Sequence, residues 1–422
     1  MLRRRTMMRT LARADDAIGS AHAAERARDL YRELHRMPEL SGRERETAAL
    51  VAARLVDSGA QVRTRVGGHG VVGVLSNGPG PVVALRAELD GLAVAESTGL
   101  PYASDRRTSL DGRQVGVSHA CGHDVHMAAV LSAVEHLAAT RAQWQGTVLT
   151  VFQPAQESGK GAAAMVADGL FEREPAPHVL LAQHVRPDPL GVITLTSGAM
   201  LTSSVTLTVT VHGTGGHVGA THGTVDVVAV LLDLLATARD LASDAGVSFA
   251  VSAVHGGASQ NTYPQTVRAD VALRGDDERA LDVLVESVTA LARHVSVRSG
   301  CPRPVEVAAG TRFGPVRNDP VATERVHHSL VAGGVPTYPL HRPSAAGDDV
   351  ATLVTAAGCP LVYWFIGAMD PDAFDTDALA RIGRGERPAG VPANHAPEFA
   401  PHLDAVVHAT RALLVAAEPW LT

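Results

Sequence analysis

Apolar positions in the first part of the chain recur at two alternating periods. Over 23–34 and 44–55 they follow the spacing of one helix face, and Pro38 separates these two runs. Short apolar runs at 71–75 and 82–85, in a region punctuated by glycine and proline, have the pattern of buried strands. We therefore expect helices and strands to alternate here.

The alternation continues to about residue 197. Apolar residues between Met127 and Leu137 trace one face of a helix, and apolar runs at 147–152 and 179–184 predict two further strands. Polar residues stand at the carboxyl ends of these strands. The pattern therefore predicts an α/β domain whose site lies at one edge of the sheet.

The pattern changes near Gly198. Valine and leucine alternate with threonine over 205–211, which is the period of a half-exposed strand. Helical runs follow at 225–241 and 279–295, and two more strand patterns lie between them at 247–254 and 267–273. We interpret this order as β-α-β-β-α-β, with no range assigned to the last strand, and it predicts a compact α+β unit inserted into the α/β domain.

These patterns set the domain boundaries. Residues 1–22 form an N-terminal extension, 23–197 the first part of the α/β domain, 198–305 the inserted unit, and 306–422 the second part of the α/β domain. A chain of 422 residues also exceeds the size at which a single hydrophobic core keeps growing. Two domains are therefore expected on length alone.

Composition limits the classes of function. The net charge of -7 and the pI near 6.3 argue against nucleic acid as a main partner, which would need a basic surface. No apolar stretch has the length of a membrane span. Three cysteines, at 121, 301 and 359, are too few and too scattered for a disulfide framework. We therefore expect a cytoplasmic protein.

Five side chains with metal-binding chemistry stand at predicted turns or strand ends. Cys121 and His123 lie two apart on a glycine-containing turn, and the others are Glu157, His184 and His395. Sulfur, imidazole and carboxylate together suit Zn, Mn, Co or Ni, in a site that could hold two ions. Taken singly each is a weak signal, because a buried thiol or a histidine at a strand end is more often structural.

Several motifs, in order and at compatible spacing, resemble those of a known family. They are Leu34-His-Arg-Met-Pro-Glu-Leu40, Arg86-Ala-Glu-Leu-Asp-Gly-Leu92, Gly99-Leu-Pro-Tyr-Ala103, His119-Ala-Cys-Gly-His-Asp124, Phe152-Gln-Pro-Ala155, Gly215-Gly-His217, Asn261-Thr-Tyr-Pro264 and Asn394-His395. Over about residues 30–399 the chain resembles the amidohydrolase branch of the dinuclear zinc-peptidase superfamily. That branch includes hippurate hydrolases, N-acyl-amino-acid amidohydrolases and hydrolases of indole-acetyl-amino-acid conjugates.

The resemblance implies a fold and an assembly. The fold would be a catalytic α/β domain of the zinc-exopeptidase type with an inserted, ferredoxin-like α+β domain. The inserted domain would act as a lid and as the surface of a homodimer. The substrate would be a small acylated amino acid, with no role for nucleic acid or membrane.

The resemblance also implies roles for individual residues. The Cys121 thiolate would bridge two metal ions, with the other four ligands completing their shells. Asp124 would orient an imidazole, and His217 would reach into the partner's site to stabilise the oxyanion. Asn261 and Arg274 would hold the substrate's carbonyl and carboxylate, although a solvated charge at a strand end explains Arg274 equally well.

Three positions depart from the family pattern. Glu88 stands where an aspartate is usual, and Gly347-Asp348-Asp349 where Ser-Glu-Asp or a similar sequence is usual. The third is Gln156, at the position of the glutamate that takes a proton from water and passes it to the leaving amine. A carboxamide does not titrate, and losing a positioned general base typically costs a factor of ~10²–10⁴.

Four explanations of Gln156 remain open. The substrate has a better leaving group, another residue (His119, His126 or His217) carries the proton, the protein binds or synthesises an acylated amino acid without hydrolysing it, or the residue was exchanged to trap a complex. The favoured function is a metal-dependent amidohydrolase that cleaves N-acyl amino acids or related small amides. The alternative is a non-hydrolytic or biosynthetic relative that binds such a ligand at the metal pocket.

Overall fold

The computed structural model of the protein describes residues 18, 20–219, 222–375, 377–384, 386 and 389–421. Contacts divide this part of the chain into two compact units. The first unit holds the described residues up to Met200, Val316–Pro343, and those from Asp348 onward; the second holds Leu201–Pro315 and Ser344–Gly347. The predicted N-terminal extension, 1–22, lies almost wholly outside the described residues.

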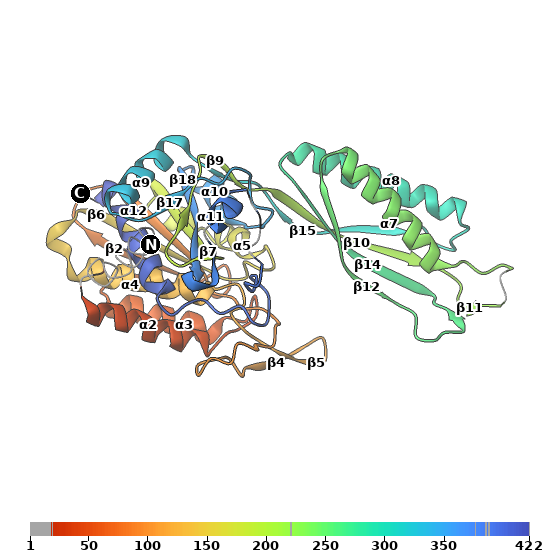
Figure 1. The fold of residues 1–422 in the computed structure, drawn as a ribbon, viewed down its shortest axis with the longest axis horizontal. Coiled ribbons are helices and arrows are strands. Elements are labelled where there is room, and N and C mark those ends of the chain that lie inside the picture. The colour runs from red at the N-terminus through yellow and green to blue at the C-terminus, as the bar shows by residue number, and fades with distance from the viewer. Residues whose placement is uncertain are drawn as a thin grey trace. The chain divides into compact units, whose positions relative to one another are not determined.

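An eight-stranded sheet forms the centre of the first unit (Figure 1), in the order β1-β2-β6-β3-β7-β18-β8-β17. In that order the strands are β1 (Gln61–Val66), β2 (Gly70–Asn77), β6 (Gly146–Gln153), β3 (Val82–Glu88), β7 (Val179–Pro189), β18 (Leu361–Met369), β8 (Ile193–Thr194) and β17 (Thr337–Tyr338). The central strands β6, β3, β7 and β18 pair in parallel. The expected α/β class is confirmed.

Helices cover this sheet, as a parallel sheet requires. Every residue of β18 is buried, and α4 and α12 pack against each other and against the central strands. The helices of the first unit are α2 (Ala21–His35), α3 (Arg45–Asp57), α4 (His123–Ala139), α5 (Gly161–Ala167), α6 (Leu170–Arg173), α9 (Pro320–Ala332), α10 (Val350–Ala357), α11 (Ala378–Gly383) and α12 (Ala405–Leu421), with the 3-10 turns η1 (Arg141–Gln143) and η2 (Pro371–Ala373).

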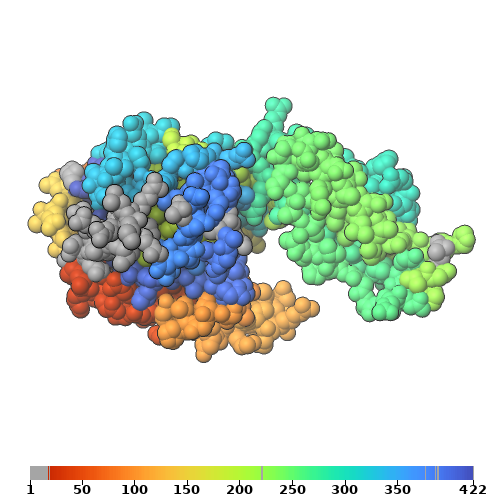
Figure 2. Space-filling model, viewed as in Figure 1, coloured from red at the N-terminus to blue at the C-terminus, as the bar shows by residue number. Residues whose placement is uncertain are grey.

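Two small strand pairs complete the first unit. Strand β9 (Gly198–Leu201) pairs with β16 (Val316–Asn318). The hairpin formed by β4 (Arg107–Leu110) and β5 (Arg113–Gly116) extends away from the body of this unit (Figure 1; Figure 2). None of the described helices combines the length and apolar composition needed to cross a bilayer.

The second unit is built on a four-stranded antiparallel sheet in the order β12-β14-β10-β15. Its strands are β10 (Ser203–His212), β12 (Ser248–Gly256), β14 (Thr266–Gly275) and β15 (Glu306–Phe313), and its helices are α7 (Val227–Asp244) and α8 (Glu278–Arg298). Alternate residues of β10, from Val205 to Val211, are buried in one cluster with apolar residues of both helices. A short pair, β11 (Gly216–His217) and β13 (Thr262–Tyr263), lies outside this sheet.

The observed boundary of the second unit differs from the sequence prediction. The predicted unit ended at residue 305, before β15, whereas β15 pairs with β10 and the second unit continues to Pro315. The sequence of β15, Glu-Val-Ala-Ala-Gly-Thr-Arg-Phe, contains few large apolar residues. Its strand pattern is therefore weak, and only pairing with β10 defines it.

Candidate metal centre

A glycine turn before α4 presents Cys121 and His123 to the same region. Gly122 has a φ of 84°, and a Cβ at this position would lie 2.2 Å from Cγ2 of Val185. Both the backbone conformation and the space therefore require glycine. Strand β7 consequently packs directly on the turn, and this contact brings His184 on β7 close to Cys121.

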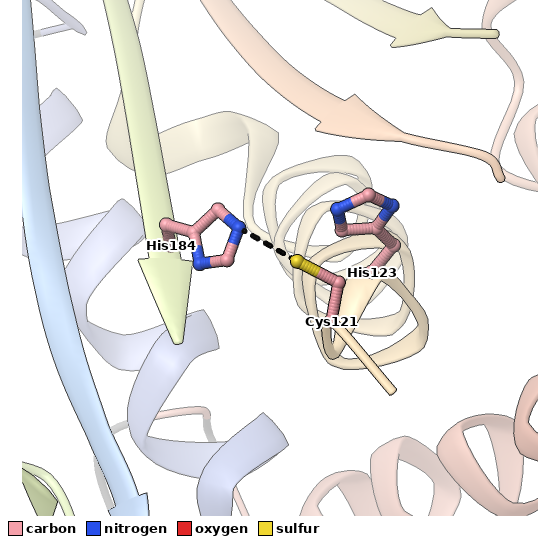
Figure 3. A group of neighbouring side chains, drawn as sticks. All are labelled: Cys121, His123 and His184. Atoms are coloured by element: carbon pink, nitrogen blue, oxygen red, sulfur yellow. Dashed lines mark hydrogen bonds between the residues drawn. The ribbon is translucent and has the colours of Figure 1, made fainter. Parts of the chain in front are cut away.

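Cys121, His123 and His184 form what we call the inner group (Figure 3). Sγ of Cys121 lies 3.4 Å from Nε2 of His184. The Nδ1 atom of His184 is 2.8 Å from the Val185 carbonyl oxygen, so Nδ1–H donates there and the Nε2 lone pair faces the sulfur. Burial, as the largest cause, lowers the pKa of His184 to about 3, which keeps this imidazole neutral.

His123 is held by Asp90, a residue that the sequence analysis did not select. Nδ1 of His123 is 2.8 Å from the Asp90 carbonyl oxygen and 3.3 Å from its Oδ1. Asp90 is itself fixed, because its Oδ2 accepts from the hydroxyl of Ser41 at 2.6 Å and from the Glu157 N–H at 2.9 Å. Nε2 of His123 is buried and has no hydrogen-bond partner among the described residues.

Cys121, Glu157 and His395 form what we call the outer group. Nε2 of His395 lies 3.3 Å from Sγ of Cys121 and 3.3 Å from Oε1 of Glu157. Glu157 also approaches the inner group, because its Oε1 lies 3.9 Å from Nε2 of His123. Burial would raise the pKa of Glu157, but His395 and His123 lower it to about 2.

A loop supplies His395. Its φ of 71° is left-handed, and its N–H donates to the Ala120 carbonyl at 2.8 Å. The neighbouring Asn394 donates through Nδ2 to the carbonyl oxygens of Cys121 and Val185, each at 3.2 Å. A non-glycine residue in this conformation is uncommon and often marks a functional site. The His395 side chain is 52% exposed, so this is the open side of the cluster.

The two groups fit divalent metal ions. In each group the potential ligand atoms lie within 4.8 Å of one another, and Cys121 belongs to both groups. The buried Nε2 of His123 has no hydrogen-bond partner in the described part of the chain, which is costly unless another ligand satisfies it. Thiolate, imidazole and carboxylate are ligands for zinc-like ions.

A third cluster of possible ligands, Glu88, His123 and His126, is less suited to a metal ion. The Val185 N–H donates to Nε2 of His126 at 2.9 Å, and Nδ1 of His126 lies 2.7 Å from Oε2 of Glu88. Both nitrogens of His126 are thus engaged. His126 is a bridging residue in this structure, and its ring nitrogens are not free to carry a proton to substrate.

Gln156 is a buried residue in the turn that follows β6. The residue is only 4% exposed, and its backbone carbonyl accepts from the Gly159 N–H at 2.8 Å. The preceding Ala155 has a left-handed φ of 51°, and its N–H donates to Oε1 of Glu44 at 2.8 Å. Glu44, which the sequence analysis did not select, therefore anchors the turn that carries Gln156 and Glu157.

Asp124 contacts an imidazole, that of His35. Its Oδ2 lies 2.6 Å from Nδ1 of His35, whose Nε2 lies 3.1 Å from Oε1 of Glu96. Burial would lower the pKa of His35, but hydrogen bonds to Asp124 and Glu96 raise it to about 10. Asp124 thus joins the first turn of α4 to the end of α2.

His119 is a second buried histidine near the turn. It is 1% exposed, and neither ring nitrogen has a hydrogen-bond partner in the described structure. Burial, the largest cause, lowers its pKa to about 4, so the ring is neutral. Among the described residues, the ring of His119 therefore forms no hydrogen bond with Gln156 or with the ligand residues, although its carbonyl accepts from the Gly122 N–H at 2.9 Å.

The three remaining predicted residues lie in the second unit. His217 and Asn261 are neighbours there, because Nε2 of His217 is 2.9 Å from Nδ2 of Asn261 and the Gly219 N–H donates to Nδ1 at 3.0 Å. Arg274, on β14, donates from Nη1 to the carbonyl of Ala345. The structure therefore brings His217 and Asn261 together, whereas Arg274 has a separate contact.

Comparisons of sequence agree with this arrangement. A sequence model of peptidase family M20/M25/M40 matches residues 84–378. YhaA of Bacillus subtilis (strain 168), which is named as an amidohydrolase, is 30% identical over 399 residues, covering 92% of this chain and 93% of the relative. The N-acetyl-L-cysteine deacetylase of the same organism is 29% identical over 329 residues, covering 76% of each chain.

Comparison of structure supports the fold. The crystal structure of the Bacillus subtilis YXEP protein, described as a dinuclear metal binding peptidase from the M20 family, matches with a TM-score of 0.71 at 22% identity and covers 94% of this chain and 99% of that chain. The likeness therefore extends over both units. Because the family model spans most of the chain and YhaA aligns along 92% of it at 30% identity, this protein belongs to peptidase family M20/M25/M40.

Proposed function

We propose that this protein is a metal-dependent amidohydrolase that cleaves the amide bond of N-acyl amino acids or related small amides. Two divalent ions (Zn, Mn, Co or Ni) would be held by Cys121, His123, Glu157, His184 and His395. The observation that carries the proposal is the shared position of Cys121, whose sulfur faces imidazoles of both the inner and the outer group. Family membership and the names of relatives, an amidohydrolase and an N-acetyl-L-cysteine deacetylase, support the reaction class.

The site's residues supply positioning. Divalent ions bound there would polarise the scissile carbonyl and promote ionisation of water. His123 and His184 each tie Nδ1 to a backbone carbonyl, so each presents Nε2 toward the cluster. The open side at His395 gives the substrate a route of approach.

Gln156 limits proton transfer at this site. Its carboxamide can orient water or a carbonyl through hydrogen bonds, but it cannot take a proton from one and deliver it to a leaving amine. We therefore propose that turnover of alkyl amides is slow in this protein. A substrate whose leaving group needs no acid assistance would be least affected.

The same residue supports a second candidate function. A relative that binds or synthesises an acylated amino acid without hydrolysing it would have no need of a titrating residue at position 156. Tight binding of an N-acyl amino acid to the metal-loaded protein without product release, measured by calorimetry and product assay, is expected for this function. Steady product release at ordinary enzyme rates would exclude it.

Substrate contacts from the second unit and a homodimer are part of the proposal. His217 and Asn261, which lie together at the β11–β13 pair, would contact the substrate carbonyl, with His217 acting on the partner's site. Arg274 would bind the carboxylate. The edge strand β12 pairs only with β14 in the described sheet and carries Val254, which is 59% exposed, so this edge is a candidate surface for the homodimer.

The decisive experiment restores a carboxylate at position 156. We expect Gln156→Glu to raise turnover of N-acyl amino acids by a factor of ~10²–10⁴, with about two ions per chain in both proteins by elemental analysis. Gln143→Glu, on the exposed turn η1, is the matched control for added charge. A wild-type protein that takes up no metal would contradict the proposal, and so would Gln156→Glu without gain across a broad panel of acyl substrates.

A further inference from the structure

Strand β7 loses its neighbour on one edge just before it reaches the metal centre. Strand β3 pairs with β7 from Val83↔Val179 to Arg86↔Ala182, and the pairing ends there. On the other edge, β18 continues to pair with β7 past His184 and Val185. A buried backbone N–H beyond Ala182 on the β3 side therefore needs another acceptor.

His126 provides this acceptor. The Val185 N–H donates to Nε2 of His126 at 2.9 Å, and the ring of His126 lies with its centroid 4.7 Å from that of His184. Since Nε2 accepts, the proton of a neutral ring is on Nδ1, which lies 2.7 Å from Oε2 of Glu88. His126 thus joins Glu88 on β3 to the backbone of β7.

Val185 links His126 to His184, a proposed metal ligand. Its N–H is fixed by His126, and its carbonyl accepts from Nδ1 of His184, the bond that turns Nε2 toward Cys121. The Val185 side chain also packs on Gly122, which precedes α4. A shift of Val185 would therefore move His184 relative to the Cys121 sulfur.

Glu88 is fixed at its other end. Its second oxygen, Oε1, accepts from Nη1 of Arg86, and Arg86 also binds both oxygens of Asp348, at 2.9 and 3.0 Å. All three side chains are at most 1% exposed. Burial alone would raise the pKa of Glu88, but the Arg86 guanidinium holds it well below its usual range.

We propose that Glu88 and His126 are positioning residues that replace the missing strand neighbour of β7 and set the orientation of His184 toward the metal ions. This inference rests on the proposed function. The extra methylene of Glu88 is needed for this role. An aspartate carboxylate would lie ~1.5 Å closer to the backbone of β3 and could not keep both Arg86 and His126 at these distances. The glutamate that departs from the family's usual residue thus gains a structural role.

Two variants of His126 separate its two bonds. His126→Phe keeps the ring volume but removes both bonds, whereas His126→Gln keeps an oxygen near the position of Nε2 and can still accept from the Val185 N–H. We expect His126→Phe to lower the affinity for Zn²⁺ by roughly 10–100-fold and to weaken the thiolate and d–d absorption of the Co²⁺-loaded protein. His126→Gln should retain most of the affinity and of the Co²⁺ spectrum.

Further controls separate positioning from loss of the fold. His408→Phe replaces another buried histidine, on α12, and should leave the Co²⁺ spectrum unchanged. Hydrogen exchange of the metal-free proteins should show faster exchange at the Val185 amide in His126→Phe than in His126→Gln. Glu88→Asp should have an affinity between those of wild type and His126→Phe.

The outcomes distinguish this inference from the proposed function. If wild type binds neither Zn²⁺ nor Co²⁺, the proposed function fails, and the exchange of the Val185 amide still tests the contact with His126. If wild type binds both ions and His126→Phe has the same affinity and the same Co²⁺ spectrum, the positioning role is overturned. Equal loss in His126→Phe and His126→Gln, with unchanged exchange at Val185, would also contradict it.

Discussion

The inner and outer groups share one sulfur but are held in different ways. In the inner group, His123 and His184 come from α4 and β7, and each ring is tied by Nδ1 to a backbone carbonyl. In the outer group, His395 comes from a loop, and its side chain is 52% exposed. One half of the centre is therefore part of the sheet and its helices, whereas a loop completes the other half at the surface.

This difference in support should affect how each group opens and exchanges its ligands. Elements buried on both sides open only with the whole unit, whereas loops with few buried contacts open locally at low cost. We therefore expect the inner group to determine whether the centre forms and the outer group to determine how readily ions and ligands exchange. Four experiments test this comparison.

The largest effect is expected from removing the shared sulfur. Cys121→Ala should lose both ions and lower turnover by roughly 10³-fold or more, because a metal ion contributes several kcal/mol of transition-state stabilisation. Elemental analysis and an N-acyl-amino-acid assay measure the two losses. Cys359→Ala, at another buried cysteine of the first unit, is the control. Retention of two ions by Cys121→Ala would show that the groups are independent.

The next effect tests the packing of the inner group. Gly122→Ala should destabilise the metal-free protein, because its Cβ would clash with Val185 and its φ of 84° disfavours alanine. Gly99→Ala is a matched control, with a φ of 72° and no heavy atom within 4 Å of the added Cβ. Urea unfolding should show an additional cost of about 1–3 kcal/mol for Gly122→Ala. Equal destabilisation by Gly122→Ala and Gly99→Ala would mean that the Val185 side chain moves aside without a measurable loss of stability.

A smaller, pH-dependent effect is expected from His35, which contacts Asp124 beside the inner group. The folded pKa of about 10 lies above the ordinary histidine pKa of 6.5, so the contribution of His35 to stability is complete below pH 6.5 and is lost as pH rises through 10. The gap in the free energy of unfolding between wild type and His35→Gln should shrink by on the order of a few kcal/mol over this range. If urea unfolding gave the same difference in the free energy of unfolding at every pH, His35 would not be protonated in the folded protein.

The smallest effect concerns metal removal. A chelator such as dipicolinate should remove ions in two phases, with the outer ion leaving on the order of tenfold faster because local opening of the loop exposes His395. His395→Ala should remove the fast phase and leave about one ion per chain. Time-resolved elemental analysis measures both quantities. A single phase in wild type would argue against a difference between the groups.

Much of the fold was predictable because it depends on local patterns. The apolar runs at 71–75, 82–85, 147–152 and 179–184 lie within β2, β3, β6 and β7. In the second unit, the helical period at 279–295 lies within α8, and the one at 225–241 lies within α7 apart from residues 225 and 226. The prediction missed β15 and the short pairs such as β4–β5. These strands contain few large apolar residues, so only their pairing partners define them.

The site was predictable to a different degree. Side-chain chemistry made Cys121, His123, Glu157, His184 and His395 candidates, but each was a weak signal among 20 histidines and 44 carboxylates. The family resemblance of the surrounding motifs favoured these five together. The supporting roles of Asp90, Glu44 and His126 were missed, although His126 had been considered as a proton carrier. Asp90 and His126 stood in or beside motifs that had been noticed, but nothing in a motif says which carboxylate contacts which imidazole.

The sequence by itself determined the class of the protein: an α/β domain with an inserted α+β unit, a set of residues with metal-binding chemistry, and an amide at position 156. Only the tertiary structure decided which atoms face one another. It assigned Asp90 to His123, Asp124 to His35, and His126 to the backbone of Val185. Periodicity and composition are properties of neighbours along the chain, whereas these contacts join residues brought together by packing of the sheet and α4.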